Sequence, residues 1–121
     1  MRFNASLSKD VYEDLKSMVM ADNSVHNALQ SRAIEWGLRQ AISLAKRGDY
    51  KRFYNETPNK TKDTIIMVCV SIDELLAKEI KAVTDKAREY RSIRTKICTW
   101  AAHHAVESWK KEKSVLHFYK D

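Results

Sequence analysis

The first eight residues place three polar side chains at every second position. Arg2, Asn4 and Ser6 are separated by single apolar residues, and this period of two is that of a half-buried strand. The three polar side chains would then share the face opposite the core. Arginine can donate two hydrogen bonds to guanine, asparagine can make two bonds to adenine, and serine can bond either base. The strand therefore carries groups that could read base edges; the alternative is an ordinary solvated polar face.

A second run, Thr64–Ser71, is rich in β-branched residues and predicts another strand. If Ile66, Val68 and Val70 face inward, the outer face carries Ile65, Met67, Cys69 and Ser71. Three of these side chains are apolar and offer no pattern of hydrogen-bond donors and acceptors. They could contact thymine methyl groups, cover another protein surface, or belong to a strand that is buried on both faces.

Residues suited to catalysis or metal binding lack the spacing that such sites require. The chain has no Gly-rich phosphate loop, no CxxC pair and no HExxH motif. Cys98, His103 and His104 fall in one helical stretch at a spacing that does not present a tetrahedral ligand set. The carboxylate pairs Glu13-Asp14 and Asp73-Glu74 fall in first turns of predicted helices, where they favour the helix dipole. We therefore expect no enzymatic activity, no metal and no cofactor.

Helical periodicity follows each predicted strand. Apolar residues recur at helical spacing from Lys9 to about Asp22, and a second helix, capped by Ser24, runs on to Ala45. In the other half, one helix is predicted over residues 72–90 and another after the cap Ser92. The order strand, helix, helix thus occurs twice in the chain.

The two capped helices match at an offset of 68 residues, which aligns Ser24 with Ser92 and Gly37 with Ala105. A glycine inside a helix costs about 1 kcal/mol relative to alanine, so a structural reason for Gly37 is expected. Small residues at both equivalent positions suggest two helices that cross closely.

The predicted repeats cover residues 1–48 and 64–121, the second with a C-terminal extension, and share one core. Residues 49–63 form a polar, turn-rich linker that contains the one proline. Phe53 and Tyr54 would pin the start of this linker to the core.

The composition indicates a small helical domain with a basic surface. The 121 residues include only 2 Gly and 1 Pro, which favours helices joined by short connections. The net charge of +6 is shared equally between the halves and suits a polyanion such as DNA or RNA. The N-terminus shows no apolar signal segment, and Cys69 and Cys98 are too few for a disulfide framework. We expect free thiols and a cytoplasmic location.

Residues 2–18, RFNASLSKDVYEDLKSM, are followed by a Ser-capped helix. This stretch resembles the alternating strand, the serine step and the Val-x-x-x-Leu helix of the ribbon-helix-helix superfamily of DNA-binding proteins, which includes Arc, MetJ and CopG-type repressors. A chain that carries this pattern twice resembles the TraY-like accessory proteins that bind near the transfer origin of conjugative plasmids. The resemblance implies a mainly α fold with one short two-stranded antiparallel ribbon, made from residues 2–8 and 65–71, in an intramolecular pseudo-dimer.

The resemblance also implies that the ribbon enters the DNA major groove. Base contacts are then expected from Arg2, Asn4, Ser6, Met67, Cys69 and Ser71. Phosphate contacts are expected at the amino ends of the second helices, from Ser24, Val25, His26, Arg91, Ser92, Arg94 and Lys96. The implied function is sequence-selective binding of double-stranded DNA by a bacterial, phage or plasmid-encoded protein, as a repressor or as a transfer accessory factor.

The apolar second strand leaves one alternative open. The same fold could serve as a protein-interaction module in which that strand grips a relaxase or another partner. The polar outer face of residues 2–6 favours DNA, whereas Ile65, Met67 and Cys69 favour protein. In either case one chain would act as the usual dimer does, with further association on DNA left open.

Overall fold

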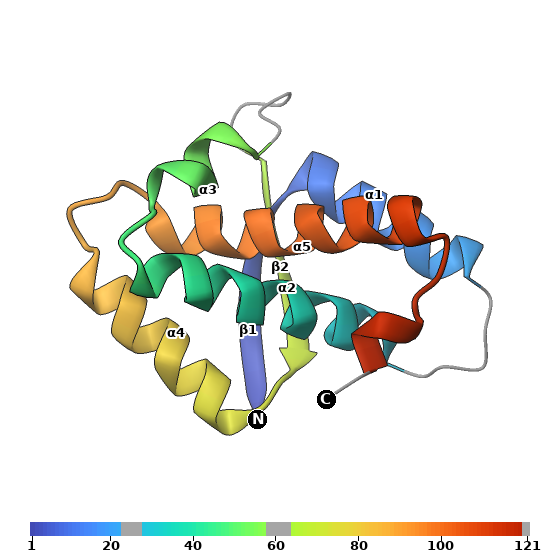
Figure 1. Ribbon diagram of the computed structural model, residues 1–121, viewed down its shortest axis with the longest axis horizontal. Coiled ribbons are helices and arrows are strands. Elements are labelled where there is room, and N and C mark those ends of the chain that lie inside the picture. The colour runs from blue at the N-terminus through green and yellow to red at the C-terminus, as the bar shows by residue number, and fades with distance from the viewer. Residues whose placement is uncertain (23–27, 58–63, 120–121) are drawn as a thin grey trace.

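The computed structural model describes residues 1–22, 28–57 and 64–119. The chain forms β1 (Arg2–Ser8), α1 (Lys9–Ala21), α2 (Leu29–Lys46), α3 (Lys51–Asn55), β2 (Ile65–Ser71), α4 (Glu74–Lys86), α5 (Ile93–Glu112) and a 3-10 helix, η1 (Leu116–Tyr119). The expected class, mainly helical with one two-stranded sheet, is confirmed (Figure 1). None of the described helices is long and apolar enough to cross a membrane.

The strands β1 and β2 form one antiparallel ribbon, in which Arg2 lies opposite Ser71 and Ser8 lies opposite Ile65. They come from opposite halves of the chain, and both have the bounds that the sequence predicts. In Figure 1 the ribbon runs behind α2 and α5 and crosses both helices. A two-stranded sheet is marginally stable on its own, so this ribbon depends on the helices that cover one of its faces.

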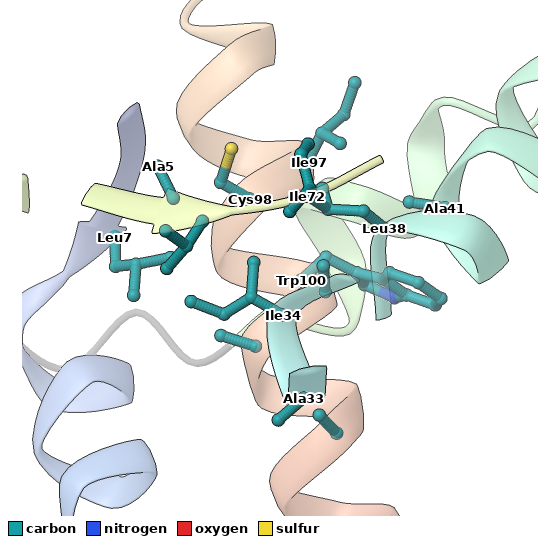
Figure 2. Close-up of a cluster of buried hydrophobic side chains, with 14 of the residues drawn as sticks. Ala5, Leu7, Ala33, Ile34, Leu38, Ala41, Ile72, Ile97, Cys98 and Trp100 are labelled. Carbon is teal, nitrogen blue, oxygen red and sulfur yellow. The ribbon is translucent and has the colours of Figure 1, made fainter. Parts of the chain in front are cut away.

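One core joins the ribbon to the two long helices. Ala5 and Leu7 of β1, Leu38 of α2, and Ile97 and Trp100 of α5 are all buried and lie together in Figure 2. Each half of the chain thus supplies part of the apolar surface that covers the other half. Burial of this kind is the main favourable contribution to folding.

The helices α2 and α5 run side by side in opposite directions across the ribbon (Figure 1). Their backbones approach closely at Gly37, where a β-carbon would lie 2.9 Å from the Ala101 Cα and would overlap the Ala101 carbonyl group. Gly37 is therefore the point of close helix contact that its position predicts. Its counterpart across the contact is Ala101, whereas the predicted partner was Ala105.

The two long helices correspond at an offset of 64 residues, about one helical turn less than the predicted 68. Ala28 and Ser92, the residues before their first turns, both have left-handed backbone, with φ of 67° and 55°. From there the buried positions match in the pairs Leu29 and Ile93, Ala33 and Ile97, Gly37 and Ala101, and Ala41 and Ala105. The predicted alignment is wrong because a helix presents the same face again after about 3.6 residues, so a shift of four also matches apolar and small residues.

The predicted start of α5 directly after Ser92 is confirmed, but the predicted capping bond is absent. Ser92 stands at the start of α5, but its hydroxyl makes no capping hydrogen bond. A capping serine normally has extended backbone, which Ser92 lacks. The helix α2 begins after Ala28, and Ser24, its predicted cap, lies outside the described residues. The helix α4 is shorter than the predicted span of 72–90.

Segments outside the strand-helix-helix order pack on the two long helices. Phe53 of α3 is fully buried, and its ring centroid lies 5.5 Å from that of Trp100 in α5. The predicted pinning of the linker by Phe53 is thus confirmed. On α2, η1 places Phe118 edge-on to Trp36, with ring centroids 5.3 Å apart.

Replacing Gly37 with Ala should lower the free energy of unfolding by at least about 2 kcal/mol, because the added methyl group must push apart two packed backbones. Urea denaturation followed by circular dichroism measures this loss. Ser43→Ala, at an exposed position of the same helix, is the matched control and should change stability by less than about 0.5 kcal/mol. A Gly37→Ala protein about 1 kcal/mol more stable than the wild type would contradict the close contact, because alanine favours the helix by about that amount when nothing opposes its methyl group.

Candidate nucleic-acid interface

The ribbon turns one face to the helices and the other to solvent. The side chains of Phe3, Ala5, Leu7, Val68 and Val70 are buried beneath it. The exposed side chains of the outer face are Arg2, Asn4, Ile65, Met67, Cys69 and Ser71. The predicted parity of both strands is therefore confirmed, and five of the six expected base-contacting residues are exposed in the free protein.

Ser6 is the exception on this face. Its side chain is only 7% exposed, and its hydroxyl donates a hydrogen bond of 3.3 Å to the Met67 sulfur. Met67 lies directly opposite Ser6 in the ribbon register and is itself 65% exposed. Opposite residues of an antiparallel pair are close enough for a long side chain to cover a short one. The prediction that Ser6 faces solvent is thus wrong, because strand parity does not show what a neighbouring methionine covers.

Side chains from the long helices bond the free edges of the ribbon. The Ser8 backbone N–H donates to the Thr99 hydroxyl at 3.1 Å, and the Ser71 N–H donates to the Ser31 hydroxyl at 3.3 Å. An unpaired strand edge is a template for unwanted pairing, and these bonds occupy parts of both edges. Sequence reasoning missed this role for Ser31 and Thr99. The available signal is a hydroxyl residue on an otherwise apolar helix face.

Arg94, predicted to contact phosphate, lies against the ribbon beside a predicted base reader. Its guanidinium donates a 2.9 Å hydrogen bond to the Asn4 carbonyl oxygen and lies 4.5 Å from the centroid of the Phe3 ring. The group is half-buried. A guanidinium has five N–H donors, so these contacts leave donors for an external anion. Arg94 therefore holds the Asn4 backbone in place as well as carrying charge.

The remaining basic residues of this region surround the start of α5. Arg91 and Ser92 are exposed, and the Lys96 ammonium lies 5.5 Å from the centroid of the Tyr54 ring. Tyr54 of α3 donates a 2.7 Å hydrogen bond to the Arg91 carbonyl oxygen. Burial, with a smaller contribution from Tyr90, raises the pKa of Tyr54, so this hydroxyl keeps the proton that it donates. The tyrosine fixes the loop before α5, a role beyond its predicted pinning of the linker.

The corresponding start of α2 is described from Ala28 onward. The predicted phosphate-contacting residues Ser24, Val25 and His26 lie outside the described residues. Arg32 in the first turn is exposed and lies 5.6 Å from the centroid of the Tyr119 ring. The first N–H groups of any helix have no partner within it and favour anions, and the first turns of α2 and α5 both present such groups beside a basic side chain.

Cys98 and His104 of α5 take part in packing. Cys98 is buried beneath the ribbon, and burial raises the pKa of its thiol to about 11. The His104 ring is stacked between Trp36 and Trp100, with centroid distances of 5.2 and 4.7 Å. Within the described residues, no group of three or more His, Cys, Asp and Glu side chains is arranged to hold a metal ion.

Comparison with protein-family models, with curated proteins and with solved structures finds no match for this chain. The ribbon, its exposed side chains and the basic residues beside it are therefore the features from which a function can be inferred.

The two cysteines should differ sharply in reactivity. Cys69 is exposed on the ribbon, whereas Cys98 is buried with a pKa near 11 and forms little of the reactive thiolate at neutral pH. Brief alkylation of the native protein, read by mass spectrometry, should add one label, and alkylation in denaturant should add two. Cys69→Ser should remove the fast label. A Cys69 that reacts only after unfolding would show that β2 is turned the other way.

Proposed function

We propose that this chain is a tandem ribbon-helix-helix protein that binds double-stranded DNA sequence-selectively, as a repressor or as an accessory factor in DNA transfer. The observation that carries the proposal is the intramolecular ribbon, whose outer face is exposed while its inner face is buried. A two-stranded ribbon fits the major groove, which is about 12 Å wide in B-DNA. One chain supplies both strands, so it presents a complete reading element without a second copy.

The chemistry of the exposed residues supports DNA as the ligand. Arg2 and Asn4 are side chains that pair with guanine and adenine edges, and Ser71 can bond either base. The bond from Arg94 and the contact of its guanidinium with Phe3 hold the β1 backbone where Asn4 is presented. A reading group held in place loses less conformational entropy when it binds. The net charge of +6 favours approach to a polyanion.

Phosphate contacts are assigned to the start of α5, through Arg91, Arg94 and Lys96. Arg91 is exposed in the loop that Tyr54 holds in place. Such contacts position the ribbon in the groove but carry no sequence information. The division of roles is therefore between Arg2 and Asn4, which read bases, and Arg91, which anchors the backbone.

A second candidate function follows from the exposed apolar residues of β2. Met67 is 65% exposed and Ile65 is 49% exposed, and apolar groups gathered on a surface mark interaction sites when they form a patch. This face could bind a partner protein such as a relaxase, in place of DNA or beside it.

Arg2→Ala and Asn4→Ala should each weaken binding to a specific duplex by about 1–3 kcal/mol, the size of one good base contact. The Asn4 change leaves the carbonyl bond to Arg94 in place, so it tests the side chain alone. Arg47→Ala, at the exposed residue that follows α2, is the matched control. Fluorescence anisotropy with specific and random duplexes measures the difference. Equal losses on both duplexes would show that neither residue reads bases.

Arg91→Ala should weaken binding to all duplexes alike and make the slope of log affinity against log salt concentration shallower by about 0.9, the effect of one lost phosphate contact. Lys78→Ala, on α4, removes the same charge at an exposed position that pairs with Glu74 and should leave the slope closer to that of the wild type. Titrations at several salt concentrations supply both slopes. Equal slopes for Arg91→Ala and the wild type would place this arginine away from DNA.

A substitution at Met67 distinguishes the two candidate functions. If β2 binds a protein, Met67→Ser should abolish capture of that partner while duplex affinity stays within about 0.5 kcal/mol of the wild type. Met20→Ser, at a methionine of α1 that is 70% exposed, controls for loss of a surface methionine. Pull-down with the purified partner and anisotropy with duplex provide the two readouts. A large loss of duplex affinity in Met67→Ser alone would instead place this residue in the DNA interface.

A further inference from the structure

The two ends of the ribbon present different chemistry. At one end the exposed pair is Arg2 and Ser71, which lie opposite each other. Asn4 and Cys69 form the next outward pair. Beyond them Met67 lies opposite Ser6, and this end is closed by the exposed Ile65. Hydrogen-bonding groups therefore lie at one end and apolar groups at the other.

A comparison of the two halves of the chain shows how far the ribbon departs from twofold symmetry. The helices α1 and α4 each have 13 residues and correspond at an offset of 65, which matches Val11 with Leu76 and Leu15 with Ile80. The same offset matches the buried residues Phe3, Ala5 and Leu7 with the buried residues Val68, Val70 and Ile72. It centres the twofold on the facing pair Asn4 and Cys69 and makes Met67 the counterpart of Arg2. A ribbon of two identical strands would carry the same residue at both of these positions.

Met67 makes its end of the ribbon less polar than the Arg2 end in two ways. It replaces the guanidinium found at the other end with a thioether, and it also covers the hydroxyl of Ser6, whose Oγ donates to the Met67 sulfur at 3.3 Å. Ser71, the counterpart of Ser6, stays exposed. The donor and acceptor groups of the Arg2 end thus have no equivalent at the Met67 end, and the surface there is apolar.

The first turns of the two long helices also differ, and the property that differs is their charge. At the offset of 64 that relates the long helices, Arg94 corresponds to Gln30 and Lys96 corresponds to Arg32. The first turn of α5 therefore carries one more positive charge than the first turn of α2. The Arg94 guanidinium also bonds the β1 backbone at Asn4, at the centre of the ribbon.

We propose that this chain recognises a non-palindromic duplex and binds it in one orientation, an inference that rests on the proposed DNA-binding function. The Arg2 end reads a half-site that contains guanine, through two hydrogen bonds to O6 and N7. The Met67 end reads a half-site of A·T pairs through the thymine methyl groups, the one apolar feature of the major groove. Met67 is the residue that makes the two half-sites different.

Selection of the full chain on a random duplex library tests the proposal without any variant. The expected result is an enriched motif whose two halves differ, with a conserved guanine in one half and A·T pairs in the other. An enriched palindrome would overturn the asymmetric reading while the DNA-binding function stands. Failure to bind any duplex would overturn the DNA-binding function, and the inference with it.

Met67→Arg gives the sharper test, because it places the same side chain at both equivalent positions and removes the cover from Ser6. This variant should bind a palindrome built from two guanine half-sites about 5- to 150-fold more tightly than the wild type does, the effect of one added base contact of about 1–3 kcal/mol. Met20→Arg adds the same charge on α1 and is the matched control. Equal gains for Met67→Arg and Met20→Arg, on the palindrome and on random duplex alike, would show that only charge had changed and would overturn the role assigned to Met67.

Discussion

The backbone of α2 meets the backbone of α5 at Gly37, where no side chain larger than hydrogen fits beside the Ala101 carbonyl group. This contact brings the two long helices close enough to lie together across the ribbon and to reach both of its edges. Glu35 of α2 accepts a 2.7 Å hydrogen bond from the Asp73 N–H, and Thr99 of α5 accepts one from the Ser8 N–H. The Ser8 bond ties the end of β1 to α5, and the Asp73 bond ties the start of α4 to α2, so each joins one half of the chain to a helix of the other half. The arrangement of the ribbon and the helices therefore depends on the close approach of α2 and α5.

The reading face follows from the same arrangement. Because the helices bury one face of the ribbon and bond its edges, the other face is presented on a fixed backbone, with Arg2 and Asn4 at positions set by the register. Arg94 joins this support to the charged surface, since one guanidinium bonds the Asn4 carbonyl oxygen and lies beside the basic start of α5. Loss of Arg94 would thus disturb both the reading strand and the anchoring charge.

Much of this structure could be predicted from alternation and periodicity. Strand bounds, strand parity and the helix after each strand follow from where apolar residues recur, because burial of one face dictates the pattern. The exposure of Met67 and Cys69 and the special place of Gly37 were predictable on the same grounds. The start of α2 was not, since the left-handed residue Ala28 carries no distinctive side-chain signal.

The predictions from the sequence that failed did so for one physical reason. Helical periodicity cannot distinguish an offset of 64 from one of 68, because both align apolar faces; the left-handed residues before the two helices and the backbone contact at Gly37 decide between them. Ser6 has the parity of an exposed residue, yet the side chain opposite it covers it. The bonds that Ser31, Arg94 and Thr99 make to the ribbon depend on the packing of distant segments. Local sequence specifies the faces of an element, and packing specifies which groups on a face stay available.

Binding of duplex DNA to the outer face of the β1–β2 ribbon can be mapped by the backbone amide chemical shifts of the isotope-labelled chain, recorded with and without a selected duplex. If this face binds DNA, the largest changes fall in residues 2–8 and 65–71 and in the first turn of α5, with small changes along α1 and α4. Changes confined to α1, α4 or η1, with the ribbon amides unmoved at saturating duplex, would contradict binding at this face.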